Sequence, residues 1–577
     1  MTRPPLKRLG AILTLFFFAM SAIVVRLVFL QVRDAEALQM RGESQRMRTV
    51  PLPAMRGAIL DRYGRELALS LEAQAVYADQ RYVTDPAAEA DKMAPLLGVR
   101  PAQIQQQLTG DGGFVYIARQ VDQSVADKLK ALELPGIGFL RESKRYYPSG
   151  ALGAPQVVGI MGVGSTDAYD EARGGLELAF NDVLSGDDGQ KQMEIGRDGN
   201  PIPQGVDIIT PPVAGLDIVT TIDPQLQYQA QLALEEAVNS NGAKGGTIIM
   251  MDPKTGEVLA MATYYPTGKK KDNLSEVDRT SNPAVGNVYE PGSVNKVITA
   301  SAVIEENKVP LNEVFHVPDS YTTYGYTIHD AESHPTERMM LGDIITHSSN
   351  VGTILVAHQL GPDLMATYLA KYGYGQVTGV GLPGESAGLL PPRYSWSGVS
   401  MANLPIGQGV AVTPLQMVNV YATVANGGVW TQPQIVKGTM DAAGTFRPAE
   451  APAQRRVVSE TTARTVTGML AHVVSSGTGT AAEIPGYWVA GKTGTGKVPD
   501  PVNGGYLDKY VASFIGFLPA SDPKIVIGVI IDQPTTYIYG GLVAAPVFQQ
   551  LGKQAIARMR IPPGEHPDFP PSAMHGR

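Results

Sequence analysis

The heptapeptide EPGSVNK, residues 290–296, decides what kind of chain this is. Its first three residues predict a turn, and the apolar residues spaced along 293–306 predict a helix. Residues three apart in a helix share one face, so Ser293 and Lys296 are expected to lie side by side. A serine held beside a lysine indicates a nucleophilic hydroxyl with a proton acceptor.

Two further strings, SSN at 348–350 and KTGT at 492–495, complete the groups that a serine acyl-transfer site needs. The first offers a second hydroxyl and an amide, and the second offers a cation with hydroxyls for an anion. The glycine of the second string lets a ligand or another backbone approach. The candidate catalytic residues are Ser293, Lys296 and Ser348, and the candidate substrate-binding residues are Asn350, Lys492, Thr493, Gly494 and Thr495.

Each string also has an interpretation without chemistry. Ser521–Lys524 repeats the serine-lysine spacing, but its proline keeps the preceding residue extended, so the two side chains share no helical face. Lys254–Gly256 repeats the lysine-threonine-glycine string at the tip of a predicted hairpin, where a solvated lysine is expected. Ser348 and Asn350 precede an apolar run, which is typical of a helix cap.

Lys296 can accept a proton only while it is neutral. Lowering a lysine pKa from about 10.4 to about 7.5 costs roughly 4 kcal/mol. Burial and a nearby cation such as Lys492 both act in that direction. We therefore expect Lys296 to be buried and close to Ser293. A titration that found Lys296 charged through the active pH range would remove it as the base.

Composition excludes several other classes of function. The 577 residues exceed what one hydrophobic core holds, so two or more domains are expected. A net charge of −8, without a basic stripe, argues against nucleic acid as the partner. The absence of cysteine removes disulfides and thiolate sites. His329 and His334 are the closest histidine pair and favour a surface loop over a metal site, so no metal or cofactor is expected.

An apolar run at Leu9–Val32, interrupted by Arg26, predicts a helix of roughly 36 Å, enough for a bilayer core of about 30 Å. A cleaved signal peptide is the alternative, but the run is long and no small-residue cleavage site follows it. Arg26 can reach the interface or face a partner helix. Basic residues flank both ends of the apolar run, so charge does not decide the orientation of the helix. The orientation is inferred from the lengths of the segments before and after the run. The short N-terminus is expected inside, and residues 33–577 outside, the cytoplasmic membrane.

Strand patterns at both ends of the C-terminal part, with helical patterns between them, predict one sheet flanked by helices, an α/β or α+β sandwich. A proline- and glycine-rich break at Pro201–Ala214 marks a domain boundary. Asp61 and Arg62 precede Gly64 in a predicted hairpin and are interpreted as a turn ion pair. The expected division is a tail at 1–8, an anchor at 9–32, a mixed α+β pedestal at 33–212, a catalytic domain at 213–560 and a disordered tail at 561–577.

The expected elements of the catalytic domain follow from hydrophobic periodicity. Helices are expected at 225–238, 293–306, 349–360, 414–425, 460–474 and 547–559, and strands at 246–251, 257–262, 488–491, 511–518 and 524–531.

The three strings in this order resemble the signatures of the penicillin-binding proteins, which are serine D,D-transpeptidases. Four other segments are similar to that family, at 252–262, 413–416, 513–519 and 539–548. The anchor and the segments 56–64, 145–150 and 175–177 resemble the class B branch and its non-catalytic pedestal. The likeness is greatest to the FtsI-like cell-division type, penicillin-binding protein 3. The elongation type, penicillin-binding protein 2, is the alternative.

The resemblance implies the serine β-lactamase and D,D-transpeptidase fold and a serine acyl-enzyme. Ser293 would attack the penultimate D-Ala of a stem peptide, with Lys296 as base and Ser348 as proton relay. Asn350 would hold the stem-peptide amide, and the string at 492–495 would bind the terminal carboxylate. The implied partners are peptidoglycan stem peptides, β-lactams, a SEDS glycosyltransferase and other division proteins of the membrane, without a cofactor.

Three rival functions use the same strings. A carboxypeptidase or β-lactamase would differ only in using water to resolve the ester. A β-lactam sensor would need a cytoplasmic signalling segment, for which the residues before Leu9 leave little room. A division scaffold with a vestigial site is disfavoured because all three strings are intact.

Overall fold

The computed structural model describes residues 6–33, 40, 42, 46–110, 113–162, 171–194, 202, 207–266 and 280–565. The chain forms two compact units. The first combines Met1–Arg56 with Ser185–Gly215, and the second combines Gly57–Leu184 with Leu216–Arg577.

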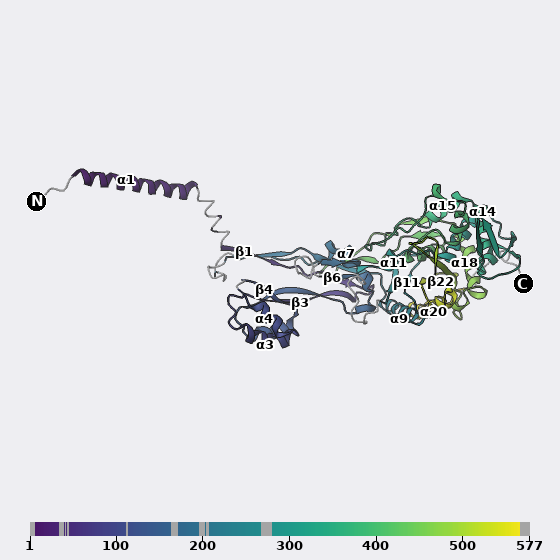
Figure 1. The fold of residues 1–577 in the computed structure, drawn as a ribbon, viewed down its shortest axis with the longest axis horizontal. Coiled ribbons are helices and arrows are strands. Elements are labelled where there is room, and N and C mark those ends of the chain that lie inside the picture. Colours follow the sequence, from purple (N-terminus) through teal and green to yellow (C-terminus); the bar gives the residue numbers. More distant parts are fainter. Residues whose placement is uncertain are drawn as a thin grey trace. The chain divides into compact units, whose positions relative to one another are not determined.

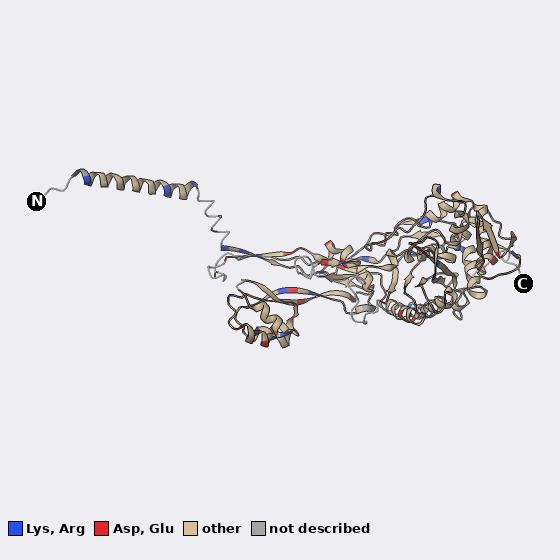
Figure 2. Ribbon diagram, in the orientation of Figure 1, with Lys and Arg blue, Asp and Glu red and all other residues tan. Residues whose placement is uncertain are grey.

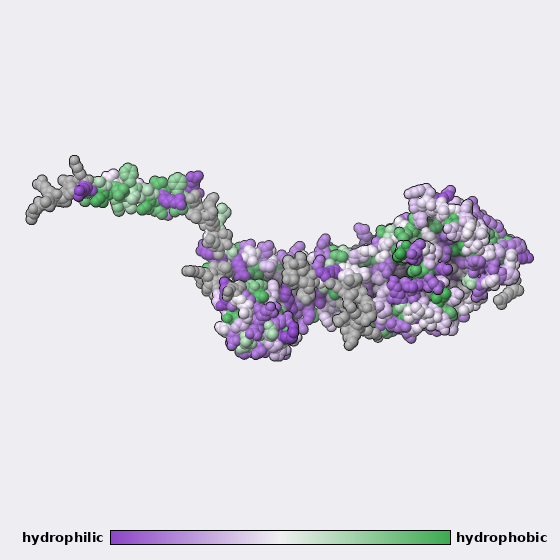
Figure 3. Space-filling view, in the orientation of Figure 1, coloured by the Kyte–Doolittle hydropathy of each residue, from purple (hydrophilic) through white to green (hydrophobic). Residues whose placement is uncertain are grey.

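The first unit begins with α1 (Leu6–Val28), which continues as one π-helical turn, η1 (Phe29–Arg33). Within the described residues, Arg8–Arg33 is the one helix long and apolar enough to cross a membrane, and its apolar window is fully unburied. Figure 3 shows this exposed apolar surface, and Figure 2 shows how few charges it carries. The helix covers the expected anchor and is compatible with a single membrane span.

The same unit contains a three-stranded antiparallel sheet in the order β1-β8-β9. Its strands are β1 (Met47–Leu52), β8 (Gly189–Glu194) and β9 (Asp207–Thr210). The last strand lies inside the break expected at Pro201–Ala214, of which residues 201 and 203–206 lie outside the described residues.

The second unit is built on a five-stranded antiparallel sheet in the order β12-β11-β23-β22-β21. Segments far apart in the sequence therefore lie side by side, and β21 forms one edge. The strands are β11 (Gly245–Met251), β12 (Val258–Tyr264), β21 (Ala490–Pro499), β22 (Tyr506–Leu518) and β23 (Ile525–Asp532).

Successive side chains of β11 point to opposite faces of the sheet and enter two separate apolar cores. Ile248 and Met250 join one core, while Ile249 and Met251 join the other. The first face is covered by α9 (Pro224–Ser240) and α20 (Ala545–Met559), which Figure 1 shows beside each other. The other face is covered by α17 (Pro414–Ala425) and α18 (Glu460–Ser476), and α12 (Lys296–Glu305) contributes to the same apolar core. The expected sandwich is confirmed.

The central helix α17 shows why the sequence predicts it so well. Thr413 caps it, Gln416 completes a capping box, and Pro414 stands at the first helical position. All twelve residues are buried, so burial on every side reinforces these local signals.

A second, seven-stranded sheet joins strands from residues 57–184 to strands from the C-terminal part of the chain. It runs β19-β18-β10-β2-β3-β4, with β5 also pairing with β3. This shared sheet explains why residues 57–184 pack with the C-terminal part of the chain. The strands are β2 (Ile59–Leu60), β3 (Glu66–Ala78), β4 (Val115–Asp122), β5 (Ile137–Tyr146), β10 (Asp217–Thr220), β18 (Val436–Met440) and β19 (Phe446–Pro448).

Shorter elements complete the second unit. Its remaining helices are α3 (Pro86–Leu97), α4 (Pro101–Leu108), α5 (Gln123–Lys130), η2 (Gly150–Leu152), α6 (Pro155–Val158), α7 (Gly175–Ala179), α8 (Asn181–Ser185), α11 (Pro283–Gly286), η3 (Gly292–Asn295), α13 (Leu341–Thr346), α14 (Asn350–Leu360), α15 (Pro362–Lys371), η4 (Arg393–Ser395), α16 (Ser400–Asn403), η5 (Leu404–Ile406), η6 (Thr480–Ala482) and α19 (Gly540–Val543). The remaining strands form hairpins or short pairs and are β6 (Ile160–Gly162), β7 (Glu171–Arg173), β13 (Phe315–Val317), β14 (Ser320–Thr323), β15 (Tyr326–His329), β16 (Glu337–Met339), β17 (Val429–Thr431) and β20 (Gln454–Arg456).

Two local expectations need correction. The strand expected at 488–491 runs over Ala490–Pro499, so the string at 492–495 lies inside a strand. Asp61 and Arg62 form no turn ion pair. The Asp61 carboxylate accepts the N–H groups of Tyr63 and Arg65, and Arg62 reaches Glu257 at 3.0 Å.

The expected C-terminal tail falls mainly on residues 566–577, which lie outside the described residues. Ile561, its first residue, is buried, and its carbonyl accepts a hydrogen bond of 2.8 Å from the Tyr487 hydroxyl. The packed part of the chain therefore extends to this residue.

Candidate active site

Ser293 lies in the 3₁₀ turn η3 and is half-buried. The Lys296 N–H donates to the Ser293 carbonyl, so the two residues occupy one turn at the start of α12. Gly292 has a φ of 60°, in the left-handed region, and its N–H donates to Gly407 at 3.0 Å. The expected helix thus begins with a tighter turn that presents the serine.

Glycines bring this turn into close contact with the edge strand β21. A Cβ added to Gly494 would lie 2.4 Å from the Ser513 Oγ and 3.0 Å from a Val294 methyl carbon. A Cβ on Gly496 would lie 2.3 Å from the Glu290 carbonyl oxygen. Only glycine permits this approach, which places the serine turn beside the strand carrying the third string.

Lys296 joins the first string to the second. Its side chain is fully buried, and Nζ donates to the Ser348 carbonyl at 2.6 Å and to the Asn350 Oδ1 at 2.8 Å. The Ser348 Oγ lies 3.4 Å away. None of the hydrogen bonds among the described residues joins Nζ to the Ser293 hydroxyl. The expected burial of Lys296 is confirmed, and its direct polar contacts lie with the second string.

Two buried lysines share this region, and burial acts on both. Burial lowers the pKa of Lys296 to about 7, against an opposing effect of Asp330. Burial, and then the charge of Lys296, hold the pKa of Lys492 well below its usual value. The site therefore disfavours two charged ammonium groups at once, and neutral pH lies within reach of proton transfer at Lys296.

The string at 348–350 divides its tasks among its three residues. Ser349 caps α14, because its Oγ accepts from the Gly352 N–H at 2.8 Å. The capping alternative therefore applies to Ser349 and leaves Ser348 and Asn350 free to contact Lys296. Ser348 has a φ of 60°, an uncommon conformation for a residue with a side chain, and such strain clusters at functional sites.

The third string lies on β21, at the edge of the five-stranded sheet. The Lys492 side chain is fully buried, and its Nζ lies 3.3 Å from both the carbonyl and the hydroxyl of Thr493. The Thr493 hydroxyl also contacts the Thr478 hydroxyl at 2.7 Å, and the Gly540 N–H donates to the Thr495 hydroxyl at 3.4 Å. Hydroxyls and the Lys492 amino group thus gather along one strand edge.

Comparison with known proteins identifies the family of this chain. The penicillin-binding protein transpeptidase domain matches residues 246–553, and the penicillin-binding protein dimerisation domain matches residues 51–220. The chain is a class B penicillin-binding protein.

The relatives agree in length as well as in sequence. The penicillin-binding protein PbpB of Mycobacterium tuberculosis is 38% identical over 96% of this chain and 85% of its own. The peptidoglycan D,D-transpeptidase FtsI of Escherichia coli is 33% identical over 94% and 90%. The crystal structure of penicillin-binding protein 3 from Mycobacterium tuberculosis with aztreonam matches with a TM-score of 0.70 and 34% identity, covering 92% of this chain and all of that one.

Lys254–Gly256 and Ser521–Lys524 are the two strings of this penicillin-binding protein that repeat the motif spacings, and they contact each other at the surface. Lys254 donates to Asp522 at 2.9 Å, and Lys524 pairs with the same carboxylate. Lys254 is exposed and Lys524 is partly exposed, which is the environment of ordinary surface ion pairs.

The two histidines considered for a metal make other polar contacts. His334 contacts Asp330 and the Pro335 carbonyl, and the His329 carbonyl accepts from the Asn350 amide at 2.8 Å. Across the described ranges, no group of three His, Cys, Asp or Glu residues could hold a metal ion.

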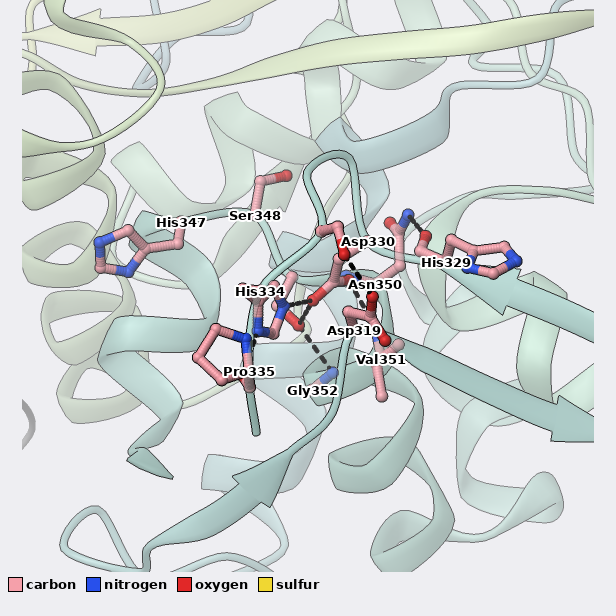
Figure 4. Close-up of polar contacts among 12 residues, drawn as sticks. Asp319, His329, Asp330, His334, Pro335, His347, Ser348, Asn350, Val351 and Gly352 are labelled. Carbon is pink, nitrogen blue, oxygen red and sulfur yellow. Dashed lines mark hydrogen bonds and ion pairs between the residues drawn. The ribbon is translucent and has the colours of Figure 1, made fainter. Parts of the chain in front are cut away.

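Asp330 also belongs to the site of this penicillin-binding protein, although the sequence did not predict it. Its Oδ1 accepts the N–H groups of Asn350 and Val351, and its Oδ2 accepts from the Ser349 hydroxyl (Figure 4). It lies 18 residues before Ser348, so no local spacing connects the two. The only available signal was the general preference of helix N-termini for acidic groups.

Proposed function

We propose that this class B penicillin-binding protein is a peptidoglycan D,D-transpeptidase that cross-links stem peptides through a serine acyl-enzyme. The observation that carries the proposal is the buried Lys296 amine, which contacts Ser348 and Asn350 from the turn that also holds Ser293. The match to the transpeptidase family supports the same chemistry.

In the first step the Ser293 oxygen attacks the carbonyl carbon of the penultimate D-Ala. Lys296, neutral at the start, takes the hydroxyl proton. The tetrahedral oxyanion would be held by the backbone N–H groups of Ser293 and Thr495, and such donors are worth about 3–4 kcal/mol each in other acyl-transfer enzymes. Ser348 would pass a proton to the departing nitrogen, so that free D-Ala leaves and an ester remains on Ser293.

The donor peptide is proposed to lie along β21. An edge strand offers unpaired backbone groups to an extended peptide. Lys492, Thr493 and Thr495 would bind the terminal carboxylate, Gly494 would let the peptide approach, and Asn350 would hold a peptide amide. The amine of a second stem then attacks the ester, forms the cross-link and returns the hydroxyl to Ser293. A β-lactam would acylate the same oxygen through its strained amide.

Turnover tests this proposal directly. Purified protein is incubated with a synthetic stem pentapeptide ending in D-Ala-D-Ala and an amine acceptor. We expect free D-Ala and a new amide product in equal amounts. Release of D-Ala together with only the hydrolysed tetrapeptide would indicate a carboxypeptidase. If neither D-Ala nor the amide product forms, the protein would instead be a β-lactam-binding scaffold without turnover.

A role in cell division is proposed over a role in side-wall elongation. The names of the relatives support it, because FtsI and penicillin-binding protein 3 recur among the close matches. Depletion of the protein followed by microscopy separates the two roles. Filamentous cells would support division, and round cells would support elongation.

The proposed placement follows from the apolar helix. Residues 1–8 would form a cytoplasmic tail, 9–32 a single anchor, 33–212 a non-catalytic pedestal and 213–560 the transpeptidase domain outside the membrane, followed by a tail at 561–577. The match of residues 51–220 to a dimerisation domain supports the pedestal. A SEDS-type glycosyltransferase and other division proteins of the membrane are the proposed partners of the anchor and the pedestal.

A further inference from the structure

The segment that follows β15 crosses the N-terminal end of α14, where Asp330 makes several contacts at once. Its carboxylate accepts the Ser349 hydroxyl at 2.7 Å, the Val351 N–H at 3.0 Å and the Asn350 N–H. The Asp330 side chain is only 6% exposed. One buried carboxylate thus fixes the backbone of the string that contacts Lys296.

The hairpin of β14 and β15 holds this segment in place. Tyr321 and Ile328 pack against a small apolar core that includes Ile354 of α14. The Tyr321 hydroxyl also contacts the His358 ring at 3.1 Å. The position of Asp330 is therefore set by packing between two elements, which a flexible loop would not provide.

His334 completes the cluster. Its Nε2 lies 3.1 Å from the Asp330 Oδ2, and its Nδ1 lies 2.8 Å from the Pro335 carbonyl oxygen. Figure 4 shows the His334 and Asp330 side chains meeting beside the start of α14. A neutral imidazole has one N–H, whereas the protonated ring donates to both oxygens. The geometry therefore fits the charged form, and these contacts raise the pKa of His334.

This pair connects to the proposed base through Asn350. The Asn350 backbone N–H donates to Asp330, and the Asn350 side-chain Oδ1 accepts from the Lys296 Nζ. The negative charge of Asp330 favours the charged form of Lys296. A protonated His334 paired with the same carboxylate would offset that charge. The other titratable groups around the cluster are Lys492, Asp319, His329, Glu337 and His347.

We infer that Asp330 is a positioning residue for acylation, and that together with His334 it sets the pH at which Lys296 gives up its proton. The inference rests on the proposed acyl-enzyme function. Asp330 orients the string at 348–350 toward Lys296, and His334 keeps that carboxylate in place and offsets its charge.

Opposite charge changes have opposite effects in this arrangement. In Asp330→Asn the carboxylate charge is lost, so Lys296 becomes neutral at lower pH, and the acid limb of the acylation profile moves down by about 0.5 to 1 pH unit. In His334→Gln the negative charge of the Asp330 carboxylate is no longer offset, so the acid limb moves to higher pH. Asp330→Asn also lowers the plateau rate about tenfold or more, because the Ser349 hydroxyl loses a charged acceptor.

The experiment measures the rate constant of acylation by a fluorescent penicillin across the pH range, using the full-length protein and the two variants. Asp319→Asn is the matched control, because Asp319 lies opposite Asp330 at the open end of the β14–β15 hairpin, but its carboxylate accepts from the exposed Ser333 hydroxyl. We expect its profile to match that of the unmodified protein. Thermal unfolding of each variant checks that it is folded.

Opposite shifts of the two limbs support the inference. Variants whose rates fall with unmoved limbs, or whose limbs move in the same direction, would overturn it. If Asp330→Asn does not fold, an unmoved limb in His334→Gln is enough to reject it. Absence of label on the unmodified protein would instead overturn the proposed function itself.

Discussion

Lys296 is the residue on which the chemistry of the site depends. It is fully buried, its Nζ contacts Ser348 and Asn350, and burial lowers its pKa to about 7. Burial of an amine disfavours its charged form, which gives a general base near neutral pH. The strained backbone of Ser348 presents this contact, and Ser349 takes over the task of capping the helix.

The first prediction concerns the pH dependence of acylation. Below a pH of about 7 the charged form of Lys296 dominates, and a charged amine accepts no proton. The acylation rate should therefore rise about tenfold per pH unit up to that point and then level off. Labelling with a fluorescent penicillin, quenched at set times between about pH 5.5 and about pH 8.5, measures this profile.

Lys296→Ala should lower the plateau of this profile by about 10²- to 10⁴-fold. A rate that stays constant across the range in the unmodified protein would contradict the role of Lys296 as the base. Equal labelling of Lys296→Ala would contradict it as well.

At this scale the sequence predicted the side chains that belong to the strings and missed the one that supports them. Ser293 and Lys296 are linked by local spacing, and burial of Lys296 follows from the need for a neutral amine. Asp330 reaches the site through a hairpin that packs on α14, which is a tertiary contact without a local signal. The hydrogen bonds of Lys296 to the second string were likewise beyond the sequence.

Among the elements, the contact between η3 and β21 decides whether the strings meet. Gly292, Gly494 and Gly496 let the two backbones approach to distances that a side chain would forbid. The edge position of β21 then leaves its outer side available to an extended peptide.

Gly496→Ala tests this contact. The added Cβ would meet a backbone oxygen, that of Glu290, at 2.3 Å, so the strand and the serine turn must separate. We expect the free energy of unfolding to fall by about 1–3 kcal/mol and acylation to fall at least about tenfold. Chemical denaturation and fluorescent penicillin labelling measure the two effects.

Lys497→Ala is the matched control, because the neighbouring Lys497 side chain on the same strand is exposed. It should leave both quantities nearly unchanged. Normal labelling of Gly496→Ala would show that this close approach is not needed for the chemistry.

Sequence signals predicted some elements better than others for a physical reason. The hydrophobic pattern located α17 to the residue, and in the structure a capping box and a proline at the first position define where the helix begins. The strand β21 was expected to end at Gly491, where the apolar pattern stops, yet pairing with β22 continues it to Pro499. Long-range pairing overrides local preference there, as it does in the sheet shared by β2, β10 and β18.

On the scale of the whole chain, the sequence predicted an anchor, a pedestal and a catalytic domain. The sandwich and the apolar helix follow from hydrophobic patterns and are present. The shared seven-stranded sheet was not foreseen, because β18 pairs with β10, more than 200 residues earlier in the sequence, only in three dimensions. Residues 57–184 therefore pack with the C-terminal part of the chain.

The anchor gives a prediction for the intact protein. The apolar helix Arg8–Arg33 is unburied, so its removal should not disturb the packed units. We expect the full-length protein to stay with carbonate-washed membranes, and a form lacking residues 1–46 to be released with an unchanged acylation rate. Retention of the shortened form on membranes would show that another part of the chain anchors it.

The most direct test of the account is to locate the acyl group. The protein is labelled with a penicillin, digested, and the modified peptide is sequenced by mass spectrometry, with Ser293→Ala and Ser521→Ala in parallel. We predict one adduct on Ser293, none in Ser293→Ala, and normal labelling in Ser521→Ala, whose serine belongs to the repeated string on the surface. An adduct on another residue, or full labelling of Ser293→Ala, would contradict the account.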